Sequence, residues 1–217
     1  MTFWDHLDEL RGVLFRSAIA LLIAAIVIFF NKSFVFDTVI FAPTSSDFIL
    51  YKWFEQLATF TGIAAMNPEP FSVNLINIEL SAQFFTHVSV SLTLAFILTV
   101  PYIIYQLWTF VSPGLYEKEK AAVRRAFAFA SVLFFIGILV GYLFVFPLTV
   151  RFLGTYQVSD WVQNQISLKS YISMFTWLIL IMGVVFEMPA LAAILSRLGI
   201  ITKSMLKKYR KQDRKSV

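Results

Sequence analysis

Four stretches without a charged side chain constrain this chain more than any other feature of its sequence. A helix needs about 20 mostly apolar residues to cross a bilayer, so stretches of about this length predict membrane spans rather than a soluble core. Hydrophobic residues make up 59% of the 217 positions. Asp, Glu, Lys and Arg are absent from residues 17–31, 80–116, 126–150 and 170–186. The sequence therefore predicts four transmembrane helices, at about residues 12–31, 84–110, 124–150 and 171–196.

The rest of the sequence fits one all-α membrane domain over residues 1–217, a polytopic helix bundle. Residues 32–82 are expected to pack over the outer ends of the spans as a cap, because they are too aromatic for a disordered loop. Within them, 48–60 have a broad apolar side that favours a helix, and 71–80 are expected to be extended. The basic tail, 197–217, is expected to lie near anionic lipid.

Prolines are predicted to shape the bundle. Pro101, Pro147 and Pro189 fall inside predicted spans, where proline removes a backbone hydrogen bond and tends to kink the helix. Kinked helices favour a concave bundle over a straight one.

The basic residues predict an orientation. One side would hold the amino terminus, the connection at 112–125 and the tail, which carry 14 of the 18 Lys and Arg residues. The other side would hold only Lys32, Lys52, Arg151 and Lys169. By the positive-inside rule, both termini are predicted in the cytoplasm.

A cleaved secretory signal peptide is the alternative interpretation of the first span. Its apolar run is longer than a typical signal-peptide core, and Phe29, Phe30 and Asn31 offer no small-residue cleavage site. We therefore expect this span to be retained as a helix.

Several classes of chemistry are not expected. The chain has no cysteine, which excludes disulfides, iron–sulfur clusters and thiolate metal sites. Its two histidines, His6 and His87, are predicted on opposite sides of the membrane, so a histidine metal cluster is not expected either. No nucleotide-binding loop or catalytic triad spacing is present. We predict a protein that is not an enzyme and holds no metal or cofactor, and whose net charge of +5 reflects topology rather than nucleic-acid binding.

Two charged patches are predicted on the cytoplasmic side. Residues 2–11 have the pattern of a short amphipathic helix that lies at the interface and leads into the first span. It includes Glu9, for which simple solvation near a helix start is the alternative to a binding role. The second patch, 112–120, includes Glu119, which has no basic residue three or four positions later. Its carboxylate is therefore available to another chain, although solvation in a loop is again the alternative.

Polar residues in the spans form a further set of candidates. Glu187 lies inside the fourth span, where a charged side chain costs roughly 2.5–3.5 kcal/mol, so we expect it to be protonated or to face a polar partner or a wet cavity. Gln106 belongs to a polar and aromatic patch at the inner end of the second span, where interhelical hydrogen bonding is the alternative to a binding role. His87 is expected to be structural.

Three motifs resemble those of a known family. The stretch His6-Leu7-x-Glu9-Leu10-Arg11 is similar to the amino-terminal motif of the TatC family, the multispanning subunit of the twin-arginine protein translocase. A second family motif is similar to Tyr105-Gln106-x-Trp108-x-Phe110-x-x-Pro113-x-Leu115-Tyr116-x-x-Glu119. The third is similar to Phe186-Glu187-x-Pro189. They occur in family order, and the span layout also matches.

The resemblance implies a function and a site. Family members recognise the paired arginines of signal peptides on folded cargo, in part through the carboxylates that match Glu9 and Glu119. An arginine guanidinium can bind a carboxylate in bidentate fashion, which agrees with such a role. The resemblance also implies a proton-motive force as energy source and a bacterial inner-membrane location. The predicted signal-peptide-binding residues are Glu9, Leu10, Arg11, Gln106, Phe110, Pro113, Leu115, Tyr116 and Glu119.

The resemblance further implies partners. The position that matches Glu187, with Pro189, lies on a concave intramembrane face and is implicated in contacts with the small single-span subunits TatA and TatB. Further copies of the chain and the lipid bilayer are expected partners, and nucleic acid is not. The family has six spans and this sequence ends after four, so the last two are expected to be missing and productive transport by this chain alone is in doubt.

Two other functions stay open at this level. A proton-coupled small-solute transporter would use Glu187 as a relay, although such transporters usually show internal repeats and a midplane site. A structural scaffold without a ligand would need none of the three glutamates.

Overall fold

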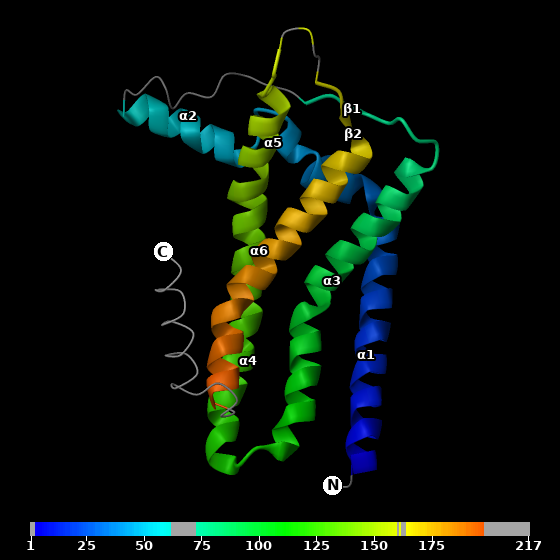
Figure 1. Cartoon of the computed structure of the whole chain (residues 1–217), viewed down its shortest axis with the longest axis vertical. Coiled ribbons are helices and arrows are strands. Elements are labelled where there is room, and N and C mark those ends of the chain that lie inside the picture. Colours follow the sequence, from blue (N-terminus) through cyan, green and yellow to red (C-terminus); the bar gives the residue numbers. More distant parts are fainter. Residues whose placement is uncertain (1–2, 62–72, 160, 162–163, 198–217) are drawn as a thin grey trace, which may run out of the picture.

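The computed structural model describes residues 3–61, 73–159, 161 and 164–197, and it is built from long helices (Figure 1). Four segments in this part of the chain are long and apolar enough to cross a membrane: His6–Phe30, Ala82–Gly114, Lys120–Thr155 and Leu168–Ala193. The predicted all-α bundle of four transmembrane helices is thereby confirmed. The tail beyond residue 197 lies outside the described residues.

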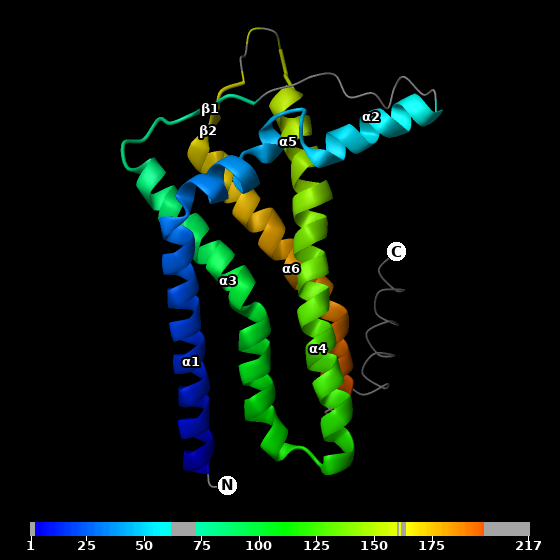
Figure 2. The ribbon, with the colours of Figure 1, turned by 180° about the vertical axis from the view of Figure 1, so that it is seen from behind.

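The first helix is longer than predicted. Helix α1 (Phe3–Phe30) runs without interruption and appears as one straight rod (Figures 1 and 2). The predicted helix at residues 2–11 is thus confirmed from Phe3 onward, but it is continuous with the span, and its place at the interface stays a prediction. No proline breaks the run, and Gly12 costs only about 1 kcal/mol relative to alanine, so the amphipathic turns continue into the span.

Helix α3 (Ala82–Val111) forms the second span and packs along α1. Pro101 lies inside this helix, and the ribbon changes direction midway along its length in both views (Figures 1 and 2). A bend at a proline is expected because its ring displaces the preceding turn. A short 3-10 turn, Ser112–Gly114, then leads to α4.

The third span consists of three consecutive helical segments. They are α4 (Glu117–Val140), a π-helical turn at Gly141–Val145 and α5 (Phe146–Thr155). Pro147 lies at the start of α5, where a missing amide is tolerated, and the π turn before it accommodates the interruption. The helix begins before the predicted span start at residue 124, because the charged residues ahead of it belong to the first turns of α4.

Glycines bring α4 and the fourth-span helix α6 (Leu168–Arg197) into close contact. A Cβ placed on Gly137 would lie 2.5 Å from the carbonyl oxygen of Met182 and 3.0 Å from the Cα of Gly183. On the other helix, a Cβ on Gly183 would lie 2.7 Å from the ring of Phe134. Small residues of this kind let two membrane helices pack backbone to backbone.

Buried tyrosines fasten the outer segment to the spans. This segment contains a π-helical turn η1 (Phe34–Ile40), a 3-10 turn η2 (Ala42–Thr44) and α2 (Ile49–Thr61). Tyr51 on α2 donates to the carbonyl of Pro147 at 2.7 Å. Tyr171 donates to Ile40 at 2.6 Å and Tyr142 donates to Val39 at 2.8 Å. The predicted helix at 48–60 is confirmed as α2, whereas the cap stays a prediction.

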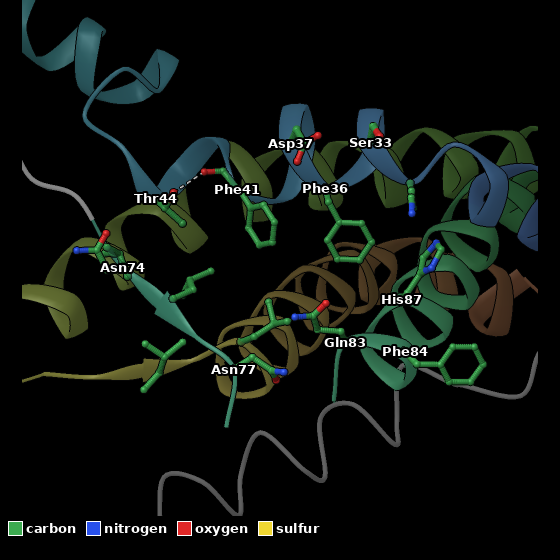
Figure 3. Close-up of a pocket in the computed structure, with 15 residues that line it drawn as sticks. Ser33, Phe36, Asp37, Phe41, Thr44, Asn74, Asn77, Gln83, Phe84 and His87 are labelled. Atoms are coloured by element: carbon green, nitrogen blue, oxygen red, sulfur yellow. Dashed lines mark hydrogen bonds between the residues drawn. The ribbon is translucent and has the colours of Figure 1, made fainter. Parts of the chain in front are cut away.

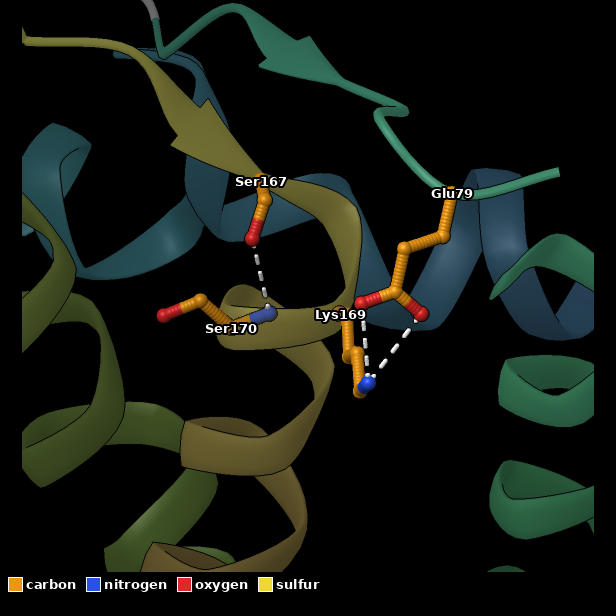
Figure 4. Close-up of polar contacts among 4 residues, drawn as sticks. All are labelled: Glu79, Ser167, Lys169 and Ser170. Carbon is orange, nitrogen blue, oxygen red and sulfur yellow. Dashed lines mark hydrogen bonds and ion pairs between the residues drawn. The ribbon is translucent and has the colours of Figure 1, made fainter. Parts of the chain in front are cut away.

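A short parallel strand pair lies beside this segment. Strand β1 (Leu75–Ile76) pairs with β2 (Ile166–Ser167), which confirms an extended part in the predicted stretch 71–80. Lys169 at the start of α6 binds both carboxylate oxygens of Glu79, at 3.0 and 3.1 Å (Figure 4). Ser167 accepts a hydrogen bond from the amide of Ser170 at 3.3 Å and so caps the helix.

Candidate functional site

The predicted cytoplasmic residues gather at one end of the molecule. The first turns of α1 and the connection between α3 and α4 lie at the same end in both views (Figures 1 and 2). The two charged patches of the sequence therefore belong to one face, at the end opposite α2 and the strand pair.

Glu9 lies in the second turn of α1, and its carboxyl is partly withdrawn from solvent. The side chain is 25% exposed, and its Oε2 lies 3.9 Å from Nδ1 of His6. Oε2 is buried and has no hydrogen-bond partner among the described residues. A carboxylate oxygen can accept more than one hydrogen bond, so this buried atom has unused acceptor capacity.

His6 and Phe110 join the first predicted patch to the inner end of α3. Their rings stack with centroids 4.2 Å apart and an interplanar angle of 21°. The contact fixes the first turns of α1 against the inner end of α3, and it provides an aromatic surface next to Glu9. Phe110 was predicted as a site residue, whereas His6 was considered as the first residue of a motif and as a possible metal ligand, but not as a site residue.

Deeper in the bundle, α1 and α3 are linked by a polar contact. Arg16 donates from Nε to Oε1 of Gln106 at 3.1 Å, and Gln106 is 6% exposed. A buried amide needs such a partner, because an unsatisfied polar group in an apolar environment costs free energy. Gln106 thus acts as interhelical glue, one of the two readings that its sequence position allowed. Arg16 was missed because it was counted only as a topology signal.

Glu119 lies in the first turn of α4 rather than in a loop. The positive end of the helix macrodipole favours an acid at such a position. Trp108 on α3 contacts Phe127 on α4 with ring centroids 5.9 Å apart, which holds the two helices together just beyond the turn. The side chain of Glu119 lies outside the described part of the structure, so its distance from Glu9 stays a prediction.

The remaining residues of the predicted site lie around this end with different exposures. Tyr116 is the residue before α4, is 80% exposed, and offers an aromatic ring to solvent or lipid. Leu10 and Leu115 are half-buried, whereas Arg11 and Pro113 are exposed. No contact of the described residues brings Arg11 or Pro113 to Glu9.

Glu187 is separate from this cluster. It lies on α6, one turn beyond Gly183, and its half-buried carboxyl faces α4 near the backbone of Phe134. Oε1 is buried and lacks a hydrogen-bond partner among the described residues. Pro189 follows on an exposed part of α6. Oε1 of Glu187 can therefore accept a hydrogen bond from a polar group outside the described structure. Among the described residues, no three His, Cys, Asp or Glu side chains form a group that could hold a metal ion.

Comparisons with known proteins agree on one family. Residues 5–212 match the family model described as Sec-independent protein translocase protein (TatC). The chain is 35% identical to the protein TatC of Blattabacterium sp. subsp. Periplaneta americana over 213 residues, which are 97% of this chain and 80% of that relative. It is 33% identical to TatC of Campylobacter jejuni over 94% of this chain and 75% of the relative.

The fold agrees as well. The crystal structure of the twin-arginine translocase receptor TatC in DDM matches with a TM-score of 0.69 and 31% identity. The match covers 95% of this chain and 82% of that chain.

Proposed function

This chain belongs to the TatC family of Sec-independent protein translocase proteins, and from that premise we propose that it binds the twin-arginine signal peptides of folded proteins at its cytoplasmic face. It is a translocase component of the membrane and not an enzyme. Binding recognises the cargo and does not change it chemically.

One observation carries the proposal. Oε2 of Glu9 is withdrawn from solvent and has no hydrogen-bond donor among the described residues. An arginine guanidinium presents five N–H donors in a planar fork, and a hydrogen bond between charged groups is roughly twice as strong as a neutral one. A signal-peptide arginine satisfies this oxygen, whereas lysine offers a point charge without the bidentate geometry.

The second arginine is assigned to Glu119. Support comes from its place at the start of α4, at the same end of the molecule as Glu9 (Figure 1). Two carboxylates on different helices demand two cations at a fixed spacing, which distinguishes a paired motif from a single basic residue.

Apolar side chains near the carboxylates receive the hydrophobic stretch that follows the arginines in a signal peptide. The stacked Phe110 and the exposed Tyr116 provide aromatic surface, and Leu10 and Leu115 extend it. The Arg16–Gln106 hydrogen bond keeps α1 and α3 in register beneath this surface. Arg11 and Pro113 belong to the proposed site because of their place in the two motifs.

Assembly is assigned to the other acid. Oε1 of Glu187, which has no hydrogen-bond partner among the residues that the structure describes, supports a hydrogen bond to a polar group on a single-span subunit of the TatA or TatB type. Pro189, beside it, shapes the helix surface that such a subunit meets, and further copies of the chain join the complex. Transport is driven by the proton-motive force across the bacterial cytoplasmic membrane, with both termini of this chain in the cytoplasm.

Removal of both acids tests the receptor role. We expect Glu9→Ala with Glu119→Ala to abolish binding of a labelled twin-arginine signal peptide to the purified chain in detergent. Asp8→Ala with Glu117→Ala is the matched control, since it removes the same charge from neighbouring positions on the same two helices. An equal loss of peptide binding in the control would show that the total negative charge, and not these two positions, determines binding. Unchanged binding by the Glu9 and Glu119 variant would reject the site.

A further inference from the structure

A cavity lies at the end of the molecule opposite Glu9. It has a volume of about 730 Å³, within the usual range of ligand pockets. Its walls come from η1, from strand β1 and from the outer end of α3 (Figure 3). None of the residues that line it belongs to the proposed signal-peptide site, so it requires its own explanation.

One wall of this cavity is a free strand edge. Among the described residues, strand β1 pairs with β2 alone, in parallel register with Leu75 opposite Ile166. Figure 3 shows β1 between β2 and the residues of η1, so its other edge is directed to the cavity. An edge strand presents backbone N–H and C=O groups to any chain that can pair with them.

A backbone hydrogen bond anchors the beginning of this strand. The amide of Val73 donates to the carbonyl of Thr44 at 3.0 Å, which ties the beginning of this strand to η2. Beyond that bond the strand separates from η1, and Val73–Asn77 line the resulting space. The described residues offer no backbone hydrogen bond between β1 and η1 within it.

The opposite wall supplies side-chain recognition. Phe36 of η1 and Phe41, the residue that follows η1, line the cavity with their aromatic rings (Figure 3). Lys32 and Asp37 also line it, and neither forms an ion pair within the described part of the chain. At one end His87 is fixed, because its Nε2 lies 3.0 Å from the carbonyl oxygen of Phe29 and its ring stacks on Phe29 at 4.0 Å.

We propose that this cavity binds an extended peptide, which adds to the free edge of β1 and places its side chains against η1. Backbone pairing gives affinity and alternate side-chain pockets give selectivity in this mode of recognition. Lys32 and Asp37 favour a peptide that carries one acidic and one basic side chain. The inference does not rest on signal-peptide binding at the other end of the molecule.

Backbone methylation provides the direct test. The probe is the fluorescent peptide acetyl-Lys-Val-Thr-Val-Glu-amide, added to the purified chain in detergent and followed by fluorescence anisotropy. Its comparison peptides have the same side chains with alternate amides N-methylated, in the two possible registers. We expect one methylated register to lose at least tenfold in affinity, because methylation removes the donors that pair with β1.

A cavity-filling variant locates the binding. Ser33 is exposed and lines the cavity, so Ser33→Trp is expected to lower peptide affinity at least tenfold. Ser170 is exposed and lies outside the cavity lining, so Ser170→Trp is the matched control and is expected to bind as the unchanged chain does. Monodisperse elution and an unchanged helical circular dichroism signal verify that both variants fold.

Three results would overturn the proposal: equal binding of the methylated peptides, undiminished binding by folded Ser33→Trp, or no binding of the probe. Occupation of the cavity by a phospholipid instead of a peptide would also overturn it. That result would appear as a loss of bound phosphatidylethanolamine from Ser33→Trp in lipid nanodiscs while peptide binding stays the same.

Discussion

Arg16 and Gln106 form a hydrogen bond of 3.1 Å that joins α1 to α3, although 90 positions separate them in the chain. The bond lies beneath the stacked rings of His6 and Phe110, so the two contacts together fix the helix pair that carries Glu9. The carboxylate is thereby held on a rigid surface rather than on a free amino-terminal segment.

The first prediction concerns this bond. Hydrogen bonds to charged groups contribute roughly 1.5–3 kcal/mol, so Arg16→Met and Gln106→Leu are expected to show a coupling energy of about this size in a double-mutant cycle. Thermal unfolding in detergent measures it for the two single variants and the double variant. Additive effects, with no coupling, would show that the contact contributes nothing to stability.

The second prediction concerns the glycine contact between α4 and α6. Gly137→Ala places a Cβ 2.5 Å from the carbonyl oxygen of Met182, so the helices must separate. Overpacking of this kind costs about 1–3 kcal/mol, which lowers the unfolding temperature. Gly114→Ala is the control, because a Cβ at Gly114 meets no atom within 4 Å. Equal effects of the two changes would contradict the close packing.

The third prediction is a pH dependence. Burial raises the pKa of Tyr51 to about 12, with the nearby Arg151 acting in the opposite direction. The folded chain therefore keeps this proton where the unfolded chain, with a pKa near 10, loses it. The contribution to stability is complete below pH 10 and is lost as the pH rises toward 12, by about 1.4 kcal/mol per pH unit.

Tyr51→Phe isolates this effect. The variant loses the hydrogen bond to Pro147 and is expected to be less stable at pH 8. Between pH 10 and 12, thermal unfolding followed by circular dichroism should show a smaller further loss in the variant than in the unchanged chain. An identical alkaline decline in both proteins would exclude Tyr51 as the titrating group.

The fourth prediction separates stability from assembly at Glu187. Its Oε1 is buried without a hydrogen-bond partner in the described part of the chain, and an unsatisfied buried polar atom costs about 1–3 kcal/mol. Glu187→Leu is therefore expected to stabilise the isolated chain, while it reduces co-purification with a TatA- or TatB-type subunit. Met188→Leu, at the exposed neighbouring position, should change neither property. A destabilised Glu187→Leu chain would mean that the acid has a structural partner.

Hydropathy predicted the four spans because charge-free windows of sufficient length have few alternatives in a membrane. The helix of the third span begins earlier than the predicted span, since Glu117 to Arg125 look like a loop by composition while they form the first turns of α4. The change from an amphipathic to an apolar pattern near residue 12 suggested a short helix ahead of the span. The backbone instead forms one continuous helix, α1. The local pattern of apolar and charged residues indicates which side chains are buried, but it does not show where a continuous helix begins.

The site was less predictable than the spans. Glu9 and Gln106 were identified from motifs, yet the partner of Gln106 and the aromatic ring beside His6 are set by helix packing. His6 meets Phe110 and Arg16 meets Gln106 only because α1 and α3 pack side by side. The glycine contact had a local signal, since Gly137 and Gly141 are four positions apart in an apolar span, a spacing typical of close helix pairs. Its partner on α6 depends on the fold.

The central claim is tested most directly by the affinity of the unaltered chain for a twin-arginine signal peptide, measured beside the same peptide with both arginines changed to lysine. The account predicts binding of the arginine peptide and at least tenfold weaker binding of the lysine peptide, because only the guanidinium fork matches the open carboxylate oxygen of Glu9. Equal affinity for the two peptides, or no binding of either, would contradict the proposed receptor site.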